Sequence, residues 1–153
     1  MNLAEILQEQ QIVTEMKATD RWEAIEELID RLISAGKLDP DSRSAVIEVV
    51  KKRESSMSTG IGFGIGIPHA STPLITEVIG AFGRSADGVD FDALDNRPVN
   101  LILLFLVPQG QFQKHLHTLA NIAKLLHNAE LRTSLEEATS AAAIMEIIEQ
   151  CTA

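Results

Sequence analysis

The chain has 153 residues, of which 45% are hydrophobic and 23% are charged, as expected for a globular protein with its own core. Its formal net charge of -9 at pH 7 argues against binding to nucleic acid or to an anionic membrane surface, since both attract clustered lysine and arginine. An acidic chain is better suited to a basic protein partner.

The length predicts a single domain over residues 1–153. Cys151 is the one cysteine and has no internal disulfide partner, which fits a reducing compartment. The first residues lack a basic segment followed by an apolar run, so no signal peptide is expected. The longest apolar run, residues 101–107, is too short to cross a bilayer. We therefore expect a cytoplasmic protein without membrane insertion.

The first part of the chain predicts a short strand and two helices. Residues 11–16 favour a strand, and a helix follows with Thr19 or Asp20 as its N-cap and Gly36 at its end. The apolar residues of this helix recur at helical spacing: Ile25, Leu28, Ile29, Leu32 and Ile33. Asp39 and Pro40 open a second helix, which carries valines inward and ends in the basic residues 51–53.

Residues 58–69 combine four glycines with large apolar residues and end in Pro68-His69. Alternation with a period of two predicts extended chain, and the glycines allow another group to approach the backbone closely. Pro68 has a fixed φ and biases the preceding residue toward extended geometry. We expect His69 to lie at the rim of a rigid segment, beside exposed N–H groups.

The second half predicts two strands separated by turns. Residues 78–82 favour a strand, and Asp87-Gly88 and Asp95-Asn96 are typical of turns. Residues 101–107 are continuously apolar, which indicates a strand covered on both faces.

Helices are expected in the last third of the chain. One of them carries an apolar stripe of Leu116, Leu119, Ala120, Ala123 and Leu126. Two more are predicted over residues 129–138 and 140–150. Strands mixed with helices, one strand being fully buried, predict an α/β sandwich.

Four histidines and one arginine are the candidates for chemistry. His69 follows the glycine-rich segment, and its alternative role is a turn histidine bonded to backbone. Arg53 suits phosphoryl oxygens through its planar guanidinium, although a basic residue at a helix end also complements the helix dipole. His115 and His117 point about 200° apart on a helix, so only one can face the His69 site, and spacing alone leaves both open. His127 is typical of a structural residue at a helix end.

The sequence argues against a nucleotide site and against a zinc site. The glycines at positions 60, 62, 64 and 66 match neither G-x-G-x-x-G nor a P-loop, so no nucleotide site is indicated. His69, His115 and His117 are the imidazoles available for a zinc site, but helical periodicity around Leu116 argues against it. We therefore expect neither a cofactor nor a metal.

Three segments in the same order resemble the EIIA domains of the phosphotransferase system, of the mannitol/fructose type. They are residues 53–69, which end in Gly66-Ile67-Pro68-His69, residues 91–99 and residues 114–120. The resemblance extends over essentially the whole chain and is strongest to the nitrogen-regulatory branch, since no transporter B or C domain is attached. The family often has a polar residue at the position of Phe63 and alanine at that of Gly66.

The resemblance implies a mixed β-sheet flanked by helices on both faces. It also implies that His69 is the phosphorylated histidine, that His115 rather than His117 is the second site histidine, and that Arg53 and Thr59 line the site. Backbone N–H groups around Gly64 and Gly66 are then expected to hold phosphoryl oxygens.

The function implied by the resemblance is that of a phosphotransferase component, not a hydrolase. Its donor is the histidine-containing phosphocarrier protein, charged from phosphoenolpyruvate, and its output is regulatory binding. One alternative is a sugar-transport EIIA that donates to an EIIB partner. The others are the zinc metalloenzyme and a domain that binds partners without being phosphorylated.

Overall fold

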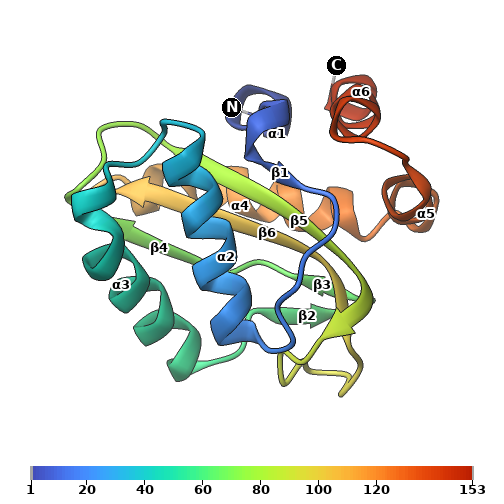
Figure 1. The fold of residues 1–153 in the computed structure, drawn as a ribbon, viewed down its shortest axis with the longest axis horizontal. Helices are drawn as coiled ribbons and strands as arrows, with labels where there is room; N and C mark the ends of the chain where they lie inside the picture. The colour runs from blue at the N-terminus through green and yellow to red at the C-terminus, as the bar shows by residue number, and fades with distance from the viewer. Residues whose placement is uncertain (1, 153) are drawn as a thin grey trace.

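The computed structural model describes residues 2–152, which form a mixed β-sheet with helices on both faces (Figure 1). The strands are β1 (Ile12–Val13), β2 (Gly60–Gly62), β3 (Ile65–Gly66), β4 (His69–Thr72), β5 (Ile79–Val89) and β6 (Val99–Pro108). The helices are α1 (Leu3–Ile6), α2 (Arg21–Ser34), α3 (Arg43–Ser56), α4 (Phe112–Leu126), α5 (Ala129–Glu137) and α6 (Ala141–Thr152). Short 3-10 turns, η1 (Glu9–Gln11) and η2 (Pro40–Ser42), precede β1 and α3. The predicted fold class is confirmed.

The sheet has the order β1-β5-β6-β3-β2, and β4 also pairs with β6, beyond the end of β3. The long pair β5 and β6 is antiparallel, whereas β1 pairs with β5 and both β3 and β4 pair with β6 in parallel. β6 is therefore the central strand of the sheet. Its partners β3 and β4 lie end to end along one side of it.

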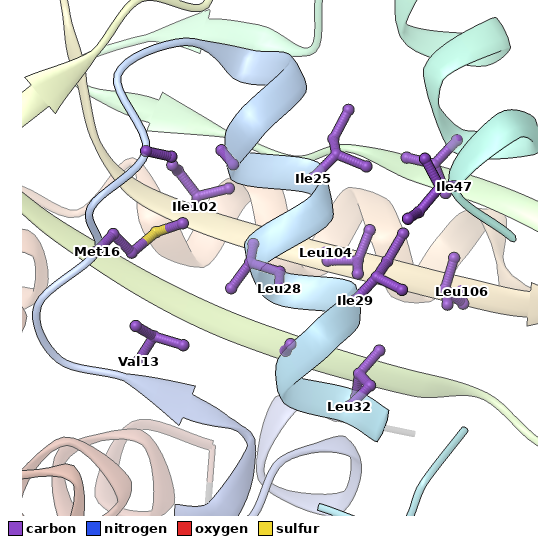
Figure 2. Close-up of a cluster of buried hydrophobic side chains, with 14 of the residues drawn as sticks. Val13, Met16, Ile25, Leu28, Ile29, Leu32, Ile47, Ile102, Leu104 and Leu106 are labelled. Carbon is purple, nitrogen blue, oxygen red and sulfur yellow. The ribbon is translucent and has the colours of Figure 1, made fainter. Parts of the chain in front are cut away.

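β6 separates two apolar cores, because successive side chains of a strand point to opposite faces. Ile102, Leu104 and Leu106 pack toward α2 and α3, as Figure 2 shows. Leu101, Leu103, Phe105 and Val107 pack on the other face, in a core that α1, α4, α5 and α6 complete. The prediction of a strand covered on both faces is confirmed.

α2 begins and packs as its sequence predicts. The Asp20 side chain accepts a hydrogen bond from the Glu23 N–H at 2.9 Å, and Glu23 in turn accepts one from the Thr19 N–H at 3.0 Å. Its buried face consists of Ala24, Ile25, Leu28, Ile29 and Leu32. The last four of these lie over the sheet in Figure 2. The charged face points away from the core, as in an amphipathic helix.

Three sequence predictions of the backbone path differ from the structure, one in length and two in direction. The predicted strand 11–16 is only two residues long, Ile12–Val13. The glycine-rich segment is a hairpin, since the chain reverses at Phe63 and Gly64, with φ values of 58° and 77°. Asp87-Gly88 is no turn: β5 continues through it with an irregular register, Gly88 having a φ of 87°. The second and third errors involve glycine at positive φ, which turns and bulges share.

Helix α4 confirms only part of the predicted stripe: Leu126 is buried and Leu119 and Ala123 pack against the core, but Leu116 and Ala120 do not. His115, Thr118, Ile122 and Leu126 are buried, whereas Leu116 is 42% exposed and Ala120 is exposed. The true stripe begins at the half-buried Phe112 and is shifted around the helix. No helix within residues 2–152 has the length and apolarity needed to span a membrane.

Candidate active site

His69 is the first residue of β4, a strand that pairs with β6 alone among the described strands. The Phe105 N–H donates a hydrogen bond to the Pro68 carbonyl at 3.0 Å, which fixes the chain just before the histidine. His69 is in register with Phe105, so its side chain leaves the sheet on the face covered by α4. The ring is half-buried at an edge of the sheet that no further strand covers.

One hydrogen bond fixes the tautomer of the His69 ring. Its Nδ1 lies 2.8 Å from the carbonyl oxygen of Ile67. A carbonyl oxygen only accepts, so Nδ1 must carry the proton. The lone pair of the neutral ring is therefore on Nε2, the ring nitrogen that is left available to react.

A cleft of about 560 Å³ opens beside His69, between α3 and β4. α3 contributes Val49, Lys52, Arg53 and Ser56, β4 contributes Ala70 and Ser71, and α4 contributes Phe112. The Phe112 ring stacks on the imidazole, with centroids 5.9 Å apart and planes 9° apart. The cleft thus combines a flat apolar wall, two hydroxyls and two cations.

Arg53 lies in the last turn of α3 and is half-buried. Its Nη1 donates to the carbonyl of Met57 at 3.0 Å, so one donor is used at the end of its own helix. The remaining donors of the guanidinium suit the oxygens of a phosphate or a carboxylate, which accept bidentate bonds. Lys52 adds a second positive charge to the same wall.

The electrostatics of the cleft favour neutral imidazole. Burial lowers the pKa of His69 below its ordinary value of 6.5, and the positive charge of Arg53 also lowers it. The hydrogen bond to Ile67 and the charge of Glu54 oppose this. The unfolded chain then binds a proton at higher pH than the folded one, so stability falls as the pH drops from 6.5 to the folded pKa.

We expect the pKa of His69, followed by NMR of its ring, to lie below 6.5 and to rise when Arg53 is replaced by glutamine. The reason is that the variant removes a cation that disfavours the protonated ring. Lys124→Gln removes a cation at the other end of α4 and should leave the pKa unchanged. A wild-type pKa at or above 6.5 would contradict the role of burial.

Thr59 is placed differently from the other predicted site residues. It is buried, its hydroxyl donates to a carboxylate oxygen of Glu54, and its N–H donates to the other at 2.9 Å. Its carbonyl accepts from the Ile67 N–H at 3.1 Å. Thr59 therefore lies behind the His69 segment and does not line the cleft.

Gly64 and Gly66 lie along the hairpin rather than at the histidine. Gly64 bonds to the N–H groups of Asn100 and Leu101, while His69 pairs with Phe105. Gly66 pairs with Ile102, three residues before Phe105. At about 3.3 Å per strand residue, this places Gly64 about 15 Å and Gly66 about 10 Å from His69. The structure does not bring Gly64 to the cleft.

The other three histidines differ in their burial. His115 lies one turn after Phe112 on the same face of α4 and is 7% exposed, and burial, followed by the charge of Lys114, lowers its pKa. His117 is exposed, and His127 is an exposed residue whose ring meets that of Phe63, 5.4 Å between centroids. Residues 2–152 contain no cluster of three side chains suited to hold a metal ion.

Phe112, Lys52, Ser56 and Ser71 are cleft residues that the sequence analysis missed. Phe112 and Ser71 carried detectable signals, since one lies three residues before His115 on a helix and the other two residues after His69 on a strand. Two larger surface hollows of about 690 Å³ lie elsewhere, one between α2 and α3 and one beside Arg84. Neither contains a histidine, so the chemistry favours the smaller cleft.

The sequence and the fold of this chain are similar to those of known proteins. Residues 5–151 match the family described as phosphoenolpyruvate-dependent sugar phosphotransferase system, EIIA 2. The chain is 39% identical over 150 residues to the fructose-specific EIIABC component of Bacillus subtilis, covering 98% of this chain but only 23% of that protein. It is 31% identical over 148 residues to a nitrogen regulatory protein of Bradyrhizobium diazoefficiens, covering 97% and 95% of the two chains.

A solved structure is similar over nearly the same length. The nitrogen regulatory protein IIA-Ntr of Neisseria meningitidis superposes with a TM-score of 0.85 at 32% identity, over 95% of this chain and 98% of that one.

Proposed function

Because the chain belongs to the EIIA 2 family of the phosphoenolpyruvate-dependent sugar phosphotransferase system, we propose that His69 carries a phosphoryl group between two partner proteins. One observation carries the proposal. The Nδ1–H of His69 is committed to the Ile67 carbonyl at 2.8 Å, and the ring borders a cleft with two cations. A neutral nucleophile beside positive charge is what phosphoryl transfer requires.

The transfer is an in-line displacement at phosphorus. Nε2 of His69 forms the new N–P bond as the bond to the donor's imidazole breaks, and the donor ring leaves with that electron pair. Arg53 and Lys52 stabilise the charge on the phosphoryl oxygens during the passage. His115, buried on α4 one turn after Phe112, is proposed to assist the transfer, whereas Thr59 acts only from behind the His69 segment.

The Nδ1 proton stays on the ring after transfer. The product is a phosphoimidazolium, with a positive ring whose Nδ1–H still donates to the Ile67 carbonyl. A protonated ring is a good leaving group, so the phosphoryl group remains ready for transfer to the next acceptor. The hydrogen bond that selects the nucleophile therefore also keeps the product reactive.

The donor that fits is the histidine-containing phosphocarrier protein. An acidic chain of net charge -9 attracts a basic partner surface, which accelerates encounter. For the output, we favour regulatory binding, supported by similarity to two nitrogen regulatory proteins over nearly their whole length. The 39% identity to a fructose-specific component supports transfer to an EIIB partner as the second candidate.

The test is phosphorylation with purified components. After incubation with phosphoenolpyruvate, Enzyme I and the phosphocarrier protein, the intact mass should rise by one phosphoryl group that is lost in acid. Adding a purified EIIB then separates the two outputs, because only a transport component should pass the group on rapidly. An unchanged mass, with a donor pair that labels a known EIIA, would refute the proposal.

A further inference from the structure

Glu54 is a carboxylate with almost no access to water. It is 1% exposed and lies at the end of α3, next to Arg53 in the sequence. Its oxygens accept from Nη1 of Arg21 at 3.2 Å, from the Thr59 N–H at 2.9 Å and from the Thr59 hydroxyl. Three segments thus meet at one buried acid: the start of α2, the end of α3 and the residue before β2.

Stability alone is a poor reason for such a group. Removing a carboxylate and a guanidinium from water costs energy that their attraction only partly returns, so a buried ion pair is often no better than apolar residues of the same volume. What a buried, fully bonded acid does well is to fix the position of its partners. The partner fixed most completely is Thr59, held through both of its donors.

Thr59 is linked in turn to the reacting ring by backbone bonds. Its carbonyl accepts from the Ile67 N–H at 3.1 Å, across the open end of the β2–β3 hairpin. The carbonyl of Ile67 then accepts from Nδ1 of His69 at 2.8 Å. Glu54 therefore clamps the open end of the hairpin, which carries the oxygen that selects the tautomer of His69.

The geometry points to Glu54 as the positioning residue of His69: through Thr59 and Ile67 it holds the ring with its proton on Nδ1 and Nε2 free for phosphoryl transfer. The consequence for transfer rests on the function proposed above, whereas the consequence for the tautomer does not. The acid acts only through other residues, since it lies behind the segment and is absent from the cleft lining.

The experiment compares Glu54→Gln and Thr59→Val with Thr59→Ser. Glutamine has the shape of glutamate but presents an NH2 group to donors, and valine removes the hydroxyl that serine retains. The nitrogen-15 shifts of the His69 ring should show Nδ1–H in the wild type and in Thr59→Ser. In Glu54→Gln and Thr59→Val the shifts should show a mixture of the Nδ1–H and Nε2–H forms. The phosphorylation rates of these two variants should fall by about 10- to 100-fold at an unchanged KM for the donor.

Arg84→Met is the control for a purely structural defect. Arg84 is a half-buried arginine whose donors hold the Thr14 carbonyl and the carbonyls at the end of α5, away from His69. The Arg84→Met variant should have a lower melting temperature, while the nitrogen-15 shifts of its His69 ring should equal those of the wild type. If Glu54→Gln fails to fold, Thr59→Val gives the same test.

A wild-type tautomer in the folded variants overturns the inference, whatever their rates. If the wild-type protein accepts no phosphoryl group, the proposed function fails, while the nitrogen-15 comparison still decides the role of Glu54.

Discussion

Replacing His69 by glutamine is expected to abolish phosphorylation completely, with no change in the fold. Glutamine retains a polar group of similar reach but has no nitrogen with an available lone pair, so no N–P bond can form. The half-buried ring contributes little to either core, and the melting temperature should therefore stay near that of the wild type. Intact mass after incubation with the donor proteins measures the result.

The remaining histidines provide matched controls. His117→Gln and His127→Gln alter exposed rings outside the cleft and should leave the rate unchanged. His115→Gln removes a buried ring one turn from Phe112 and should slow transfer by about tenfold or more without abolishing it. Acid-labile phosphate retained in His69→Gln would transfer the assignment to another residue, and an unaltered rate in His115→Gln would exclude that ring from the mechanism.

These variants also separate the alternatives. A zinc site of His69, His115 and His117 would need three rings at one point, but His115 is buried on α4 while His117 is exposed. Such an enzyme would lose bound metal with any of the three replacements, which metal analysis of untagged protein measures. A domain that only binds partners would show no phosphorylation in the wild type, so the loss in His69→Gln could not be observed.

The position of His69 could be predicted from sequence because it depends on local chemistry. Pro68 suffices to place it at the end of a rigid segment, whereas its place at the sheet edge comes from pairing with β6, which the sequence did not predict. The path of the glycine-rich segment could not be predicted, since Gly62-Phe63-Gly64 alternates equally well in a strand and in a hairpin. The difference lies in the positive φ of Phe63, an uncommon conformation for a residue with a side chain.

The neighbours of His69 are harder to predict from the sequence, because they depend on packing between segments that are distant in the chain. Phe112 stacks on the His69 ring from the first turn of α4. This contact depends on which side of the helix faces the sheet. The phase was misjudged because Leu116 was assigned to the core, while the buried position belongs to His115. Thr59 was expected in the cleft, but the carboxylate of Glu54 takes up its hydroxyl, a contact that adjacency in sequence does not reveal.

Replacing Gly88 by alanine is expected to destabilise the sheet strongly, because two separate costs add at this position. Gly88 has a φ of 87°, where a residue with a Cβ is strained by about 1–2 kcal/mol. A Cβ at this position would also lie 2.6 Å from the Cβ of Pro98, whose ring cannot rotate away. Overpacking of this kind adds roughly 1–3 kcal/mol, so the free energy of unfolding should fall by about 3 kcal/mol.

Gly110→Ala separates the two causes. Gly110 has nearly the same φ, 86°, but a Cβ there would have nothing within 4 Å. Its replacement should therefore cost only the strain, about 1 kcal/mol. Urea unfolding of both variants gives the comparison, and the difference of ~2 kcal/mol measures the contact with Pro98. Equal losses would mean that Pro98 moves aside, and the bulge of β5 would then be held by backbone conformation alone.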